Sequence, residues 1–204
     1  MVATKFPYVN ASEDVEQEQL TDSGIICVKA AGNNYHPCAG PNVPYYSGIY
    51  DSYFKYSGGD LRYNRPSSPH SDDTIFVANM DREQFGTEEY ITEKSERGPR
   101  IDIIAGGVDI SSATSQVSGY PGTQFYPGSA THKMTRISGT SMAAPQVTGV
   151  GALWLQANPG GTAQQFKDFL KIHSTANSYD SGTDESFDDF NTCLLYTTDA
   201  ADEG

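Results

Sequence analysis

The stretch that most constrains this chain is Ser138-Gly139-Thr140-Ser141-Met142-Ala143-Ala144-Pro145, which leads into a long apolar run. The helical spacing of the apolar residues predicts a helix over 141–156. Ser141 would stand in its first turn, where backbone N–H groups lack intrahelical partners and proline is tolerated. Those N–H groups favour a developing oxyanion, so Ser141 is a candidate nucleophile, with an ordinary helix cap as the alternative. The positions expected to face the core are Val147, Val150, Leu153, Trp154 and Ala157.

Composition argues against several classes of function. The net charge of −13 argues against a nucleic-acid-binding surface, which needs clustered basic residues. The sequence has no apolar run of about 18 residues, so no membrane span is expected. The three cysteines fit neither a disulfide framework nor a metal-ligand spacing. Cys27 is expected to pack as a small apolar residue, with a Cys27–Cys38 disulfide as the alternative.

The order of the expected elements predicts an α/β domain, for which 204 residues are sufficient. A helix is expected over 12–21, capped by Ser12 and with Val15 and Leu20 facing inward. Apolar runs rich in branched side chains are typical of buried parallel strands. The strands expected on this basis are 24–28, 73–80 and 101–105.

The second half of the chain predicts a hairpin and a last helix. Segments 108–113 and 132–137 are expected to pair antiparallel, which would place the loop between them beside Ser141. A helix over 163–173 is expected to be capped by Thr162. Its inward positions are Phe166, Phe169, Leu170 and Ile172.

Residues 35–70 are rich in proline, glycine and tyrosine and are expected to form a long loop. The tyrosines could line a peptide groove, but packing of the loop onto the domain is favoured. They are Tyr45, Tyr46, Tyr50, Tyr53, Tyr56 and Tyr63.

Two loops carry motifs that resemble the subtilases, the subtilisin-like serine proteases. Ala30-Ala31-Gly32-Asn33 resembles the segment that supplies the family's oxyanion-hole asparagine, which gives that role to Asn33. Gly139-Thr140-Ser141-Met142-Ala143-Ala144-Pro145 resembles the segment of the nucleophile, which gives that role to Ser141. A neutral amide can donate to the oxyanion of a tetrahedral intermediate without its own proton chemistry. Thr140 and the Ser141 backbone N–H would lie beside the same oxyanion.

The resemblance covers roughly residues 12–175 and implies a three-layer subtilisin-like fold, with a mainly parallel sheet flanked by helices. It implies a serine endopeptidase that acts on polypeptides without a cofactor and outside the cell, with virion association as an alternative setting. Ala30, Ala31 and Gly32 would form a wall of the pocket for the residue before the scissile bond. Calcium is frequent in the family, but the acidic residues here show no ligand spacing, and no metal is expected.

Two positions depart from the family's pattern. Gly106 stands where proline is usual, which loosens a turn. Gln146 stands where histidine is common, although that histidine is not catalytic. Neither departure removes a group that the chemistry needs.

The base and the carboxylate of a serine protease are missing. In subtilisins the chain order is Asp, His, Ser, so both would precede Asn33, and only 32 residues do so. Asp22 and Asp180 lie in Asp-Ser-Gly strings like the family's aspartate motif, but Asp22 precedes a strand instead of following one and Asp180 lies in a polar stretch. The four histidines stand outside the family's His-Gly-Thr-His setting and are expected at the surface or in loops: His36, His70, His132 and His173.

We therefore expect residues 1–192 to be the C-terminal half of a subtilase catalytic domain, incomplete at its N-terminal side and inactive alone. The expected partner is the missing N-terminal half of the same domain. Residues 193–204 resemble a translated sequencing adapter and are expected to be a non-native tail, with a disordered acidic tail as the alternative.

Two rival functions stay open. The α/β-hydrolases place their serine in Gly-x-Ser-x-Gly, which residues 139–143 nearly match, but their histidine follows the serine and the loop at Asn33 would be unexplained. A pseudoprotease or binding module would use the same fold as a scaffold, with the tyrosine-rich loop as its contact surface.

Overall fold

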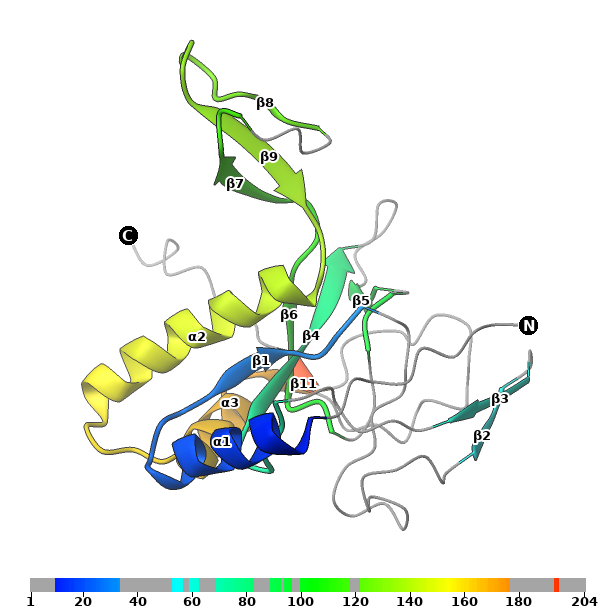
Figure 1. The fold of residues 1–204 in the computed structure, drawn as a ribbon, viewed down its shortest axis with the longest axis vertical. Coiled ribbons are helices and arrows are strands. Elements are labelled where there is room, and N and C mark those ends of the chain that lie inside the picture. The colour runs from blue at the N-terminus through cyan, green and yellow to red at the C-terminus, as the bar shows by residue number, and fades with distance from the viewer. Residues whose placement is uncertain are drawn as a thin grey trace.

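The computed structural model describes residues 10–33, 53–56, 59–62, 69–82, 89–92, 94–96, 100–117, 122–176 and 193–194. Its helices are α1 (Ala11–Asp22), α2 (Thr140–Ala157) and α3 (Ala163–Ile172). Its strands are β1 (Val28–Ala30), β2 (Tyr53–Tyr56), β3 (Gly59–Arg62), β4 (Ile75–Arg82), β5 (Glu89–Ile91), β6 (Ile103–Gly106), β7 (Ile110–Thr114), β8 (Gln124–Phe125), β9 (Lys133–Ile137), β10 (Thr175–Ala176) and β11 (Cys193–Leu194). They form a central sheet, a hairpin and a three-stranded sheet (Figure 1).

The central sheet has the order β1-β4-β6-β11-β10, with β5 antiparallel to the end of β4. Strands β1, β4 and β6 are parallel, and Val77 of β4 lies between Ala30 and Ile103. The predicted strands at 73–80 and 101–105 and the α/β architecture are therefore confirmed. The carboxyl ends of these three strands meet at one edge of the sheet, which is where ligands bind in open parallel sheets.

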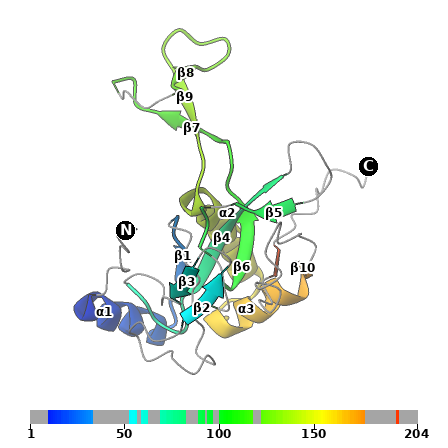
Figure 2. The same ribbon diagram turned by 90° about the vertical axis from the view of Figure 1, so that its right-hand side faces the viewer.

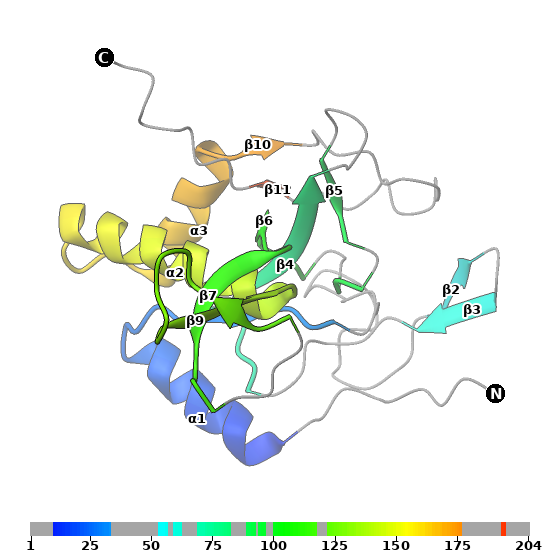
Figure 3. The ribbon, with the colours of Figure 1, turned by 90° about the horizontal axis from the view of Figure 1, so that it is seen from above.

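The core lies on both faces of β4, because successive side chains of a strand point to opposite faces. On one face, Val77 packs with Val147 of α2 and Phe166 of α3, and all three are fully buried. On the other face, Phe76 packs with Ala31. Figure 3 shows α2 and α3 as neighbours, consistent with their shared cluster. Burial of side chains of this size contributes about 1.5–3 kcal/mol each, which makes this face the main link between helices and sheet.

Helix α1 packs through polar side chains, which the predicted pattern did not anticipate. Val15 and Leu20 were expected to face inward but are 52% and 45% exposed. Gln17 and Thr21 are buried instead, and Gln17 Nε2 donates to Thr74 Oγ1 at 2.9 Å. Hydrogen bonds, rather than burial of apolar side chains, thus determine which face of α1 packs against the start of β4.

The helix starts follow local capping rules. Asn10 caps α1 by accepting a hydrogen bond from the backbone N of Ser12, so the predicted cap at Ser12 is wrong by two residues. Thr162 caps α3 as predicted, and it forms a reciprocal capping box with Gln165.

Strand β1 begins later than the predicted strand at 24–28. Gly24 has a φ of 88°, and the backbone N of Ile25 still donates to the carbonyl of Leu20 at the end of α1. Ile25 is 50% exposed, and Cys27 is a half-buried free thiol, not part of a disulfide. The chain joins the sheet only once it has left the helix terminus, at Val28.

The long segment 35–70 contains a hairpin, so the loop prediction is wrong in part. β2 and β3 pair antiparallel, with Tyr53 opposite Arg62. The side chains of its tyrosines lie outside the described residues, and the choice between groove and packing stays a prediction.

Helix α2 faces the sheet through small residues. The ring of Phe166 lies so close to Gly151 that a Cβ there would be 3.0 Å from it, and Val147 is one turn away on the same face. Gly151 thus allows close approach to α3, while the buried Ala143 and Ala144 allow close approach to the sheet. The apolar residues outside this face are therefore left in solvent. Leu153 and Ala157 of α2 were expected in the core but are exposed, and the same is true of Ile172 at the end of α3.

The sheet β7–β9–β8 projects from the body (Figures 1 and 2). The predicted pairing of 108–113 with 132–137 is confirmed, with Ile110 opposite Ile137 and Thr114 opposite Lys133. β8, which was not predicted, adds a third strand. The segment between β7 and β9 lies at the far end of the sheet, so the expectation that it lies beside Ser141 is wrong.

A buried ion network fastens α3 to the start of the sheet. The Asp102 carboxylate pairs with Arg100 Nη1 at 2.8 Å and with Lys167 Nζ at 3.2 Å. The backbone N of Phe76 donates a hydrogen bond to the same carboxylate. Lys167 also donates to the carbonyl of Asp72 at 2.8 Å. Burial lowers the pKa of Lys167, and the Asp102 carboxylate opposes that shift.

The last described residues extend the central sheet. Leu194 of β11 pairs parallel with Ile104, and β10 pairs antiparallel with β11. The first two residues of the expected non-native tail are thus part of the sheet. Within the described ranges, no helix combines the length and the apolar character needed to cross a bilayer.

Candidate active site

The two motif loops meet at the carboxyl edge of the parallel sheet (Figure 1). β1 ends at Ala30 and is followed by Ala31, Gly32 and Asn33. β9 ends at Ile137 and leads through Gly139 into the first turn of α2. Because α2 packs across β1, β4 and β6, its N-terminus is held over the ends of these strands.

The side-chain amide of Asn33 is held in one orientation by Thr140. Its Oδ1 accepts from the Thr140 backbone N at 3.0 Å and from the Thr140 hydroxyl at 3.3 Å. That hydroxyl in turn accepts from Gly32 N at 3.2 Å. A backbone N–H can only donate, so the amide oxygen faces Thr140 and the Nδ2 donors point the other way. Asn33 is therefore fixed as a donor, next to the residue that precedes Ser141.

Two glycines allow the loops to approach this closely. Gly139 has a φ of 153°, and a Cβ there would lie 3.2 Å from Asn33 Oδ1. A Cβ at Gly107 would lie 2.7 Å from the Gly139 carbonyl, and Gly139 N donates to the Gly107 carbonyl at 2.8 Å. The end of β6 and the loop before Ser141 are thus in direct backbone contact.

The start of α2 presents Ser141 and buries Thr140. Gly139 is the N-cap residue and has no side chain with which to cap the helix. Thr140 is fully buried and Ser141 is exposed. A helix N-terminus carries roughly half a positive charge, which favours an anion beside Ser141.

Pro145 lies at the sixth position of α2, in the second turn, not in the first as predicted. Because proline has no N–H, the usual hydrogen bond from position 145 to the Ser141 carbonyl is absent. The two departures from the family's pattern contact each other here, since Gln146 Nε2 donates to the Gly106 carbonyl. Gln146 also donates to the Met142 carbonyl at 3.2 Å, so it ties the first turns of α2 to β6.

The carboxylate of Glu96 lies buried behind residues 30–32, the predicted wall of the substrate pocket. The sequence analysis did not predict this carboxylate. Gly32 has a φ of 128°, and a Cβ there would lie 2.5 Å from the carboxylate of Glu96. Glu96 is 5% exposed, and its N donates to the Gly32 carbonyl at 2.9 Å. Ala31 is buried in the core cluster of Phe76, so it can offer the wall its backbone rather than its methyl group. Ala30 is half-buried beside it.

A cavity of about 310 Å³ opens next to Asn33. It includes Asn79, whose buried Oδ1 has no hydrogen-bond partner among the described residues. An open space with this amide oxygen in its lining therefore adjoins Asn33. The lining residues are Asn33, Asn79, Thr92, Lys94, Val108, Ser138 and Gly139.

The described histidines lie away from Ser141 in the fold. His70 precedes β4, is buried and stacks on Phe76 with ring centroids 5.7 Å apart. His132 precedes β9 on the projecting sheet, and His173 follows α3, 4.5 Å from the ring of Phe169. His70 is thus in a loop as predicted but not at the surface, while His36 and Asp180 lie outside the described residues. Within the described ranges, no cluster of three or more His, Cys, Asp or Glu side chains could hold a metal ion.

The sequence comparisons point to one family. A family model described as the subtilase family matches residues 7–189. Subtilisin Savinase from Lederbergia lenta is 35% identical over 92 residues, covering 43% of this chain and 29% of its own length. Serine protease AprX from Bacillus subtilis is 32% identical over 117 residues, covering 50% of this chain and 24% of its own length. The chain thus spans less than a third of the length of these relatives.

Solved structures agree on the fold. The chain superposes on a cold adapted subtilisin-like serine proteinase with a TM-score of 0.57 and 22% identity, covering 94% of this chain and 52% of that one. It superposes on fervidolysin from Fervidobacterium pennivorans, a keratinolytic enzyme related to subtilisin, with a TM-score of 0.60 and 22% identity, covering 93% and 24%. Motifs, fold and family match agree, and this chain belongs to the subtilase family.

Proposed function

We propose that this chain carries the nucleophile and the oxyanion hole of a serine endopeptidase. The observation that supports the proposal best is the pair of hydrogen bonds that holds Asn33 Oδ1 on Thr140, directly before Ser141. An amide held by its oxygen presents its N–H groups as fixed donors, which is what a tetrahedral oxyanion needs.

In the proposed reaction, Ser141 Oγ attacks the scissile carbonyl carbon while a base removes the hydroxyl proton. The carbonyl oxygen becomes an oxyanion and accepts hydrogen bonds from Asn33 Nδ2 and the Ser141 backbone N–H. Collapse of the intermediate breaks the C–N bond, and the leaving amine takes the proton from the base. Water then hydrolyses the acyl group on Ser141 by the same two steps.

We propose that the base and its carboxylate come from sequence outside these 204 residues. The chain order Asp, His, Ser of subtilisins places both upstream, and the described histidines have other surroundings. The chain alone then keeps a nucleophile without a base. The residual catalysis expected of such a site is far below that of a complete triad, as triad mutants of serine proteases have shown.

The proposed substrate is a polypeptide that lies along the wall formed by Ala30, Ala31 and Gly32. The Glu96 carboxylate fills the space that a Cβ of Gly32 would occupy, so this part of the wall offers a substrate its backbone rather than a side chain. The resemblance to subtilisins also favours an extracellular site of action.

Labelling with a fluorophosphonate probe tests the proposal. The chain alone is compared with a longer protein, in which the chain is preceded by the polypeptide that its upstream coding sequence encodes. Peptide hydrolysis is measured in parallel. We expect Ser141 of the chain alone to react at least about 10³-fold more slowly. Ser141→Ala should abolish labelling and hydrolysis in the longer protein, whereas Ser12→Ala, at an exposed serine of α1, should not.

Three outcomes would contradict parts of this proposal. Rapid labelling of the chain alone would show that a base lies within it. Hydrolysis that survives Ser141→Ala would show that Ser141 is not the nucleophile. A longer protein that binds peptides but is never labelled would favour the pseudoprotease or binding module.

A further inference from the structure

The projecting sheet β7–β9–β8 differs in charge from the chain as a whole. Residues 110–137 contain Lys133 and Arg136 but neither Asp nor Glu. The whole chain has 26 acidic and 13 basic residues and a net charge of −13. A positive segment thus stands out from an acidic protein, and it projects away from the body (Figure 2).

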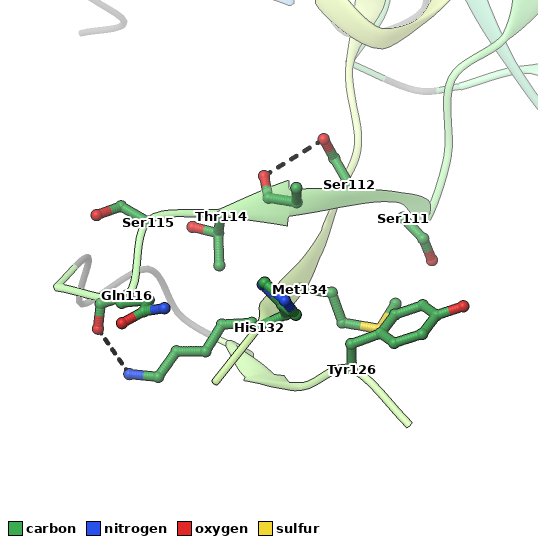
Figure 4. A pocket seen from close by; sticks show the side chains of 10 residues that line it. Ser111, Ser112, Thr114, Ser115, Gln116, Tyr126, His132 and Met134 are labelled. Atoms are coloured by element: carbon green, nitrogen blue, oxygen red, sulfur yellow. Dashed lines mark hydrogen bonds between the residues drawn. The ribbon is translucent and has the colours of Figure 1, made fainter. Parts of the chain in front are cut away.

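One face of this sheet is hollowed by a cavity of about 600 Å³ (Figure 4). In the antiparallel register Ala113 pairs with Met134, so both side chains lie on the same face. Met134 and Tyr126 line the hollow together with His132. The hollow therefore combines an apolar surface with an imidazole ring beside it.

The two cations are positioned at the hollow. Arg136 is exposed, and its Nε donates to the hydroxyl of Ser111, a lining residue, at 3.2 Å. Lys133 Nζ donates to the Gln116 carbonyl at 2.7 Å and lies 5.7 Å from the ring centroid of Phe125. These partners are neutral, so they restrain both side chains without cancelling their charges.

Large apolar side chains around the hollow are also exposed. Val117 is 94% exposed, Phe125 55% and Tyr126 59%. Exposed apolar groups gathered beside fixed charges are typical of an interaction surface. The fitting partner carries carboxylates together with apolar side chains.

The sheet is continuous with the candidate nucleophile. β9 spans five residues, a length of about 17 Å at the usual rise per residue, and ends four residues before Ser141. The backbone N of Asp109 donates to Ser138 Oγ at 2.9 Å, which pins the base of the sheet to the nucleophile loop. An extended chain that lies on the sheet can therefore continue to Ser141.

We propose that the sheet β7–β9–β8 is a docking surface for an acidic segment of the polypeptide substrate. An apolar side chain of that segment occupies the hollow at Met134 and Tyr126, and its carboxylates face Arg136 and Lys133. That the occupant is a substrate rests on the proposed function. The charge and shape of the occupant rest on the sheet itself.

Fluorescence anisotropy on the 204-residue chain with Ser141→Ala tests this, because no bound peptide can then be cleaved. The probes are three fluorescein-labelled peptides of equal length, with the same Leu and Tyr positions and with Glu, Gln or Lys elsewhere. We expect the Glu peptide to bind at least about tenfold more tightly than the other two at roughly 50 mM salt. The advantage should shrink at about 0.5 M salt, where screening is strong.

Charge reversal on the sheet locates the binding surface. Arg136→Glu and Lys133→Glu should each weaken binding of the Glu peptide by about three- to tenfold. Lys171→Glu makes the same charge change at an exposed position in the last turn of α3 and should leave binding unchanged. Thermal unfolding of each variant checks that the fold is retained.

Equal binding of the three peptides, or an equal loss with Lys171→Glu, would overturn the proposal. Sedimentation that shows a dimer abolished by Arg136→Glu would assign the surface to a second copy of this acidic chain instead. The binding assay involves no chemistry, so its failure is distinct from a failure of the proposed protease activity, which the fluorophosphonate measurement reports.

Discussion

The corner that holds Asn33 and Ser141 adjoins the sheet β7–β9–β8, yet the two regions are built differently. The corner is a set of hydrogen bonds between distant segments, with Thr140 fully buried at its centre. The sheet is held mainly by its own strand pairing and leaves Phe125 and Val117 in solvent. The corner holds hydrogen-bond donors in fixed positions, whereas the sheet offers exposed apolar area and positive charge.

The difference separates what chemistry requires from what recognition requires. An oxyanion donor displaced by about 1 Å loses most of its value, so its surroundings must be over-determined. A docking surface tolerates rearrangement because its contacts are long-range charges and apolar area. Matched substitutions in the two regions test this separation.

Phe166→Ala should destabilise the fold by about 3–5 kcal/mol, because its fully buried ring fills the contact between α3 and Gly151 of α2. Phe125→Ala on the projecting sheet should change the free energy of unfolding by about 0.5 kcal/mol or less, since Phe125 is 55% exposed. Urea unfolding of both variants measures the contrast. Equal losses would mean that the sheet is part of the core and would end the comparison.

Asn33→Ala should lower kcat of the longer protein by about 10²–10³-fold, the range established for the corresponding asparagine of subtilisin. Asn33→Asp should be no better, because it keeps the oxygen that Thr140 binds but removes the N–H donors. Steady-state kinetics checks both variants. Asn158→Ala, at the exposed C-terminus of α2, is the control and should leave kcat unchanged. Full activity of Asn33→Asp would refute the donor role.

Gly139→Ala and Gly128→Ala place the same methyl group in the two regions, and both positions have positive φ, 153° and 81°. Each should lose about 1–2 kcal/mol of stability from backbone strain. The new methyl at position 139 would also lie 3.2 Å from Asn33 Oδ1, whereas nothing lies within 4 Å at position 128. We therefore expect kcat to fall for Gly139→Ala alone. A similar fall for Gly128→Ala would show that the sheet also positions the reacting groups.

The smallest effect is a pH dependence of stability from Lys167. Burial lowers the pKa of Lys167 below its unfolded value of 10.5, so the unfolded chain binds more protons between the two values. Stability should accordingly rise with pH through that window, by less than about 1.4 kcal/mol per pH unit. Urea midpoints measured at increasing pH up to 10.5 should show a smaller rise for Lys167→Met, and Lys133→Met on the projecting sheet is the control. If the stability of Lys167→Met rises with pH as much as that of the wild type, Lys167 is not the source of the pH dependence.

Local patterns were sufficient where the signal lies in neighbouring residues. The branched run at 73–80, the helix after Ser141 and the cap at Thr162 all formed as predicted, because strand propensity, helical spacing and capping act over a few residues. The resemblance of two motifs also indicated the family before any geometry was known.

Patterns failed where the partner surface decided the outcome. Val15, Leu20 and Leu153 looked like core residues but are exposed, because α1 docks through Gln17 and α2 through its small side chains. The periodicity of apolar residues shows which residues share one face of a helix. It does not show which face packs against the sheet. The buried Glu96 behind Gly32 had no local signal at all.

By itself, the sequence determined that a serine at a helix start and an asparagine after a strand belong to one kind of protein. Only the tertiary structure decided that Asn33 faces Thr140 with its oxygen, and that the sheet β7–β9–β8 projects from the body and carries Lys133 and Arg136 with it. The reason is that a hydrogen bond between residues 107 positions apart, and the direction in which a sheet projects, depend on how the whole chain closes. No window of neighbouring residues contains that information.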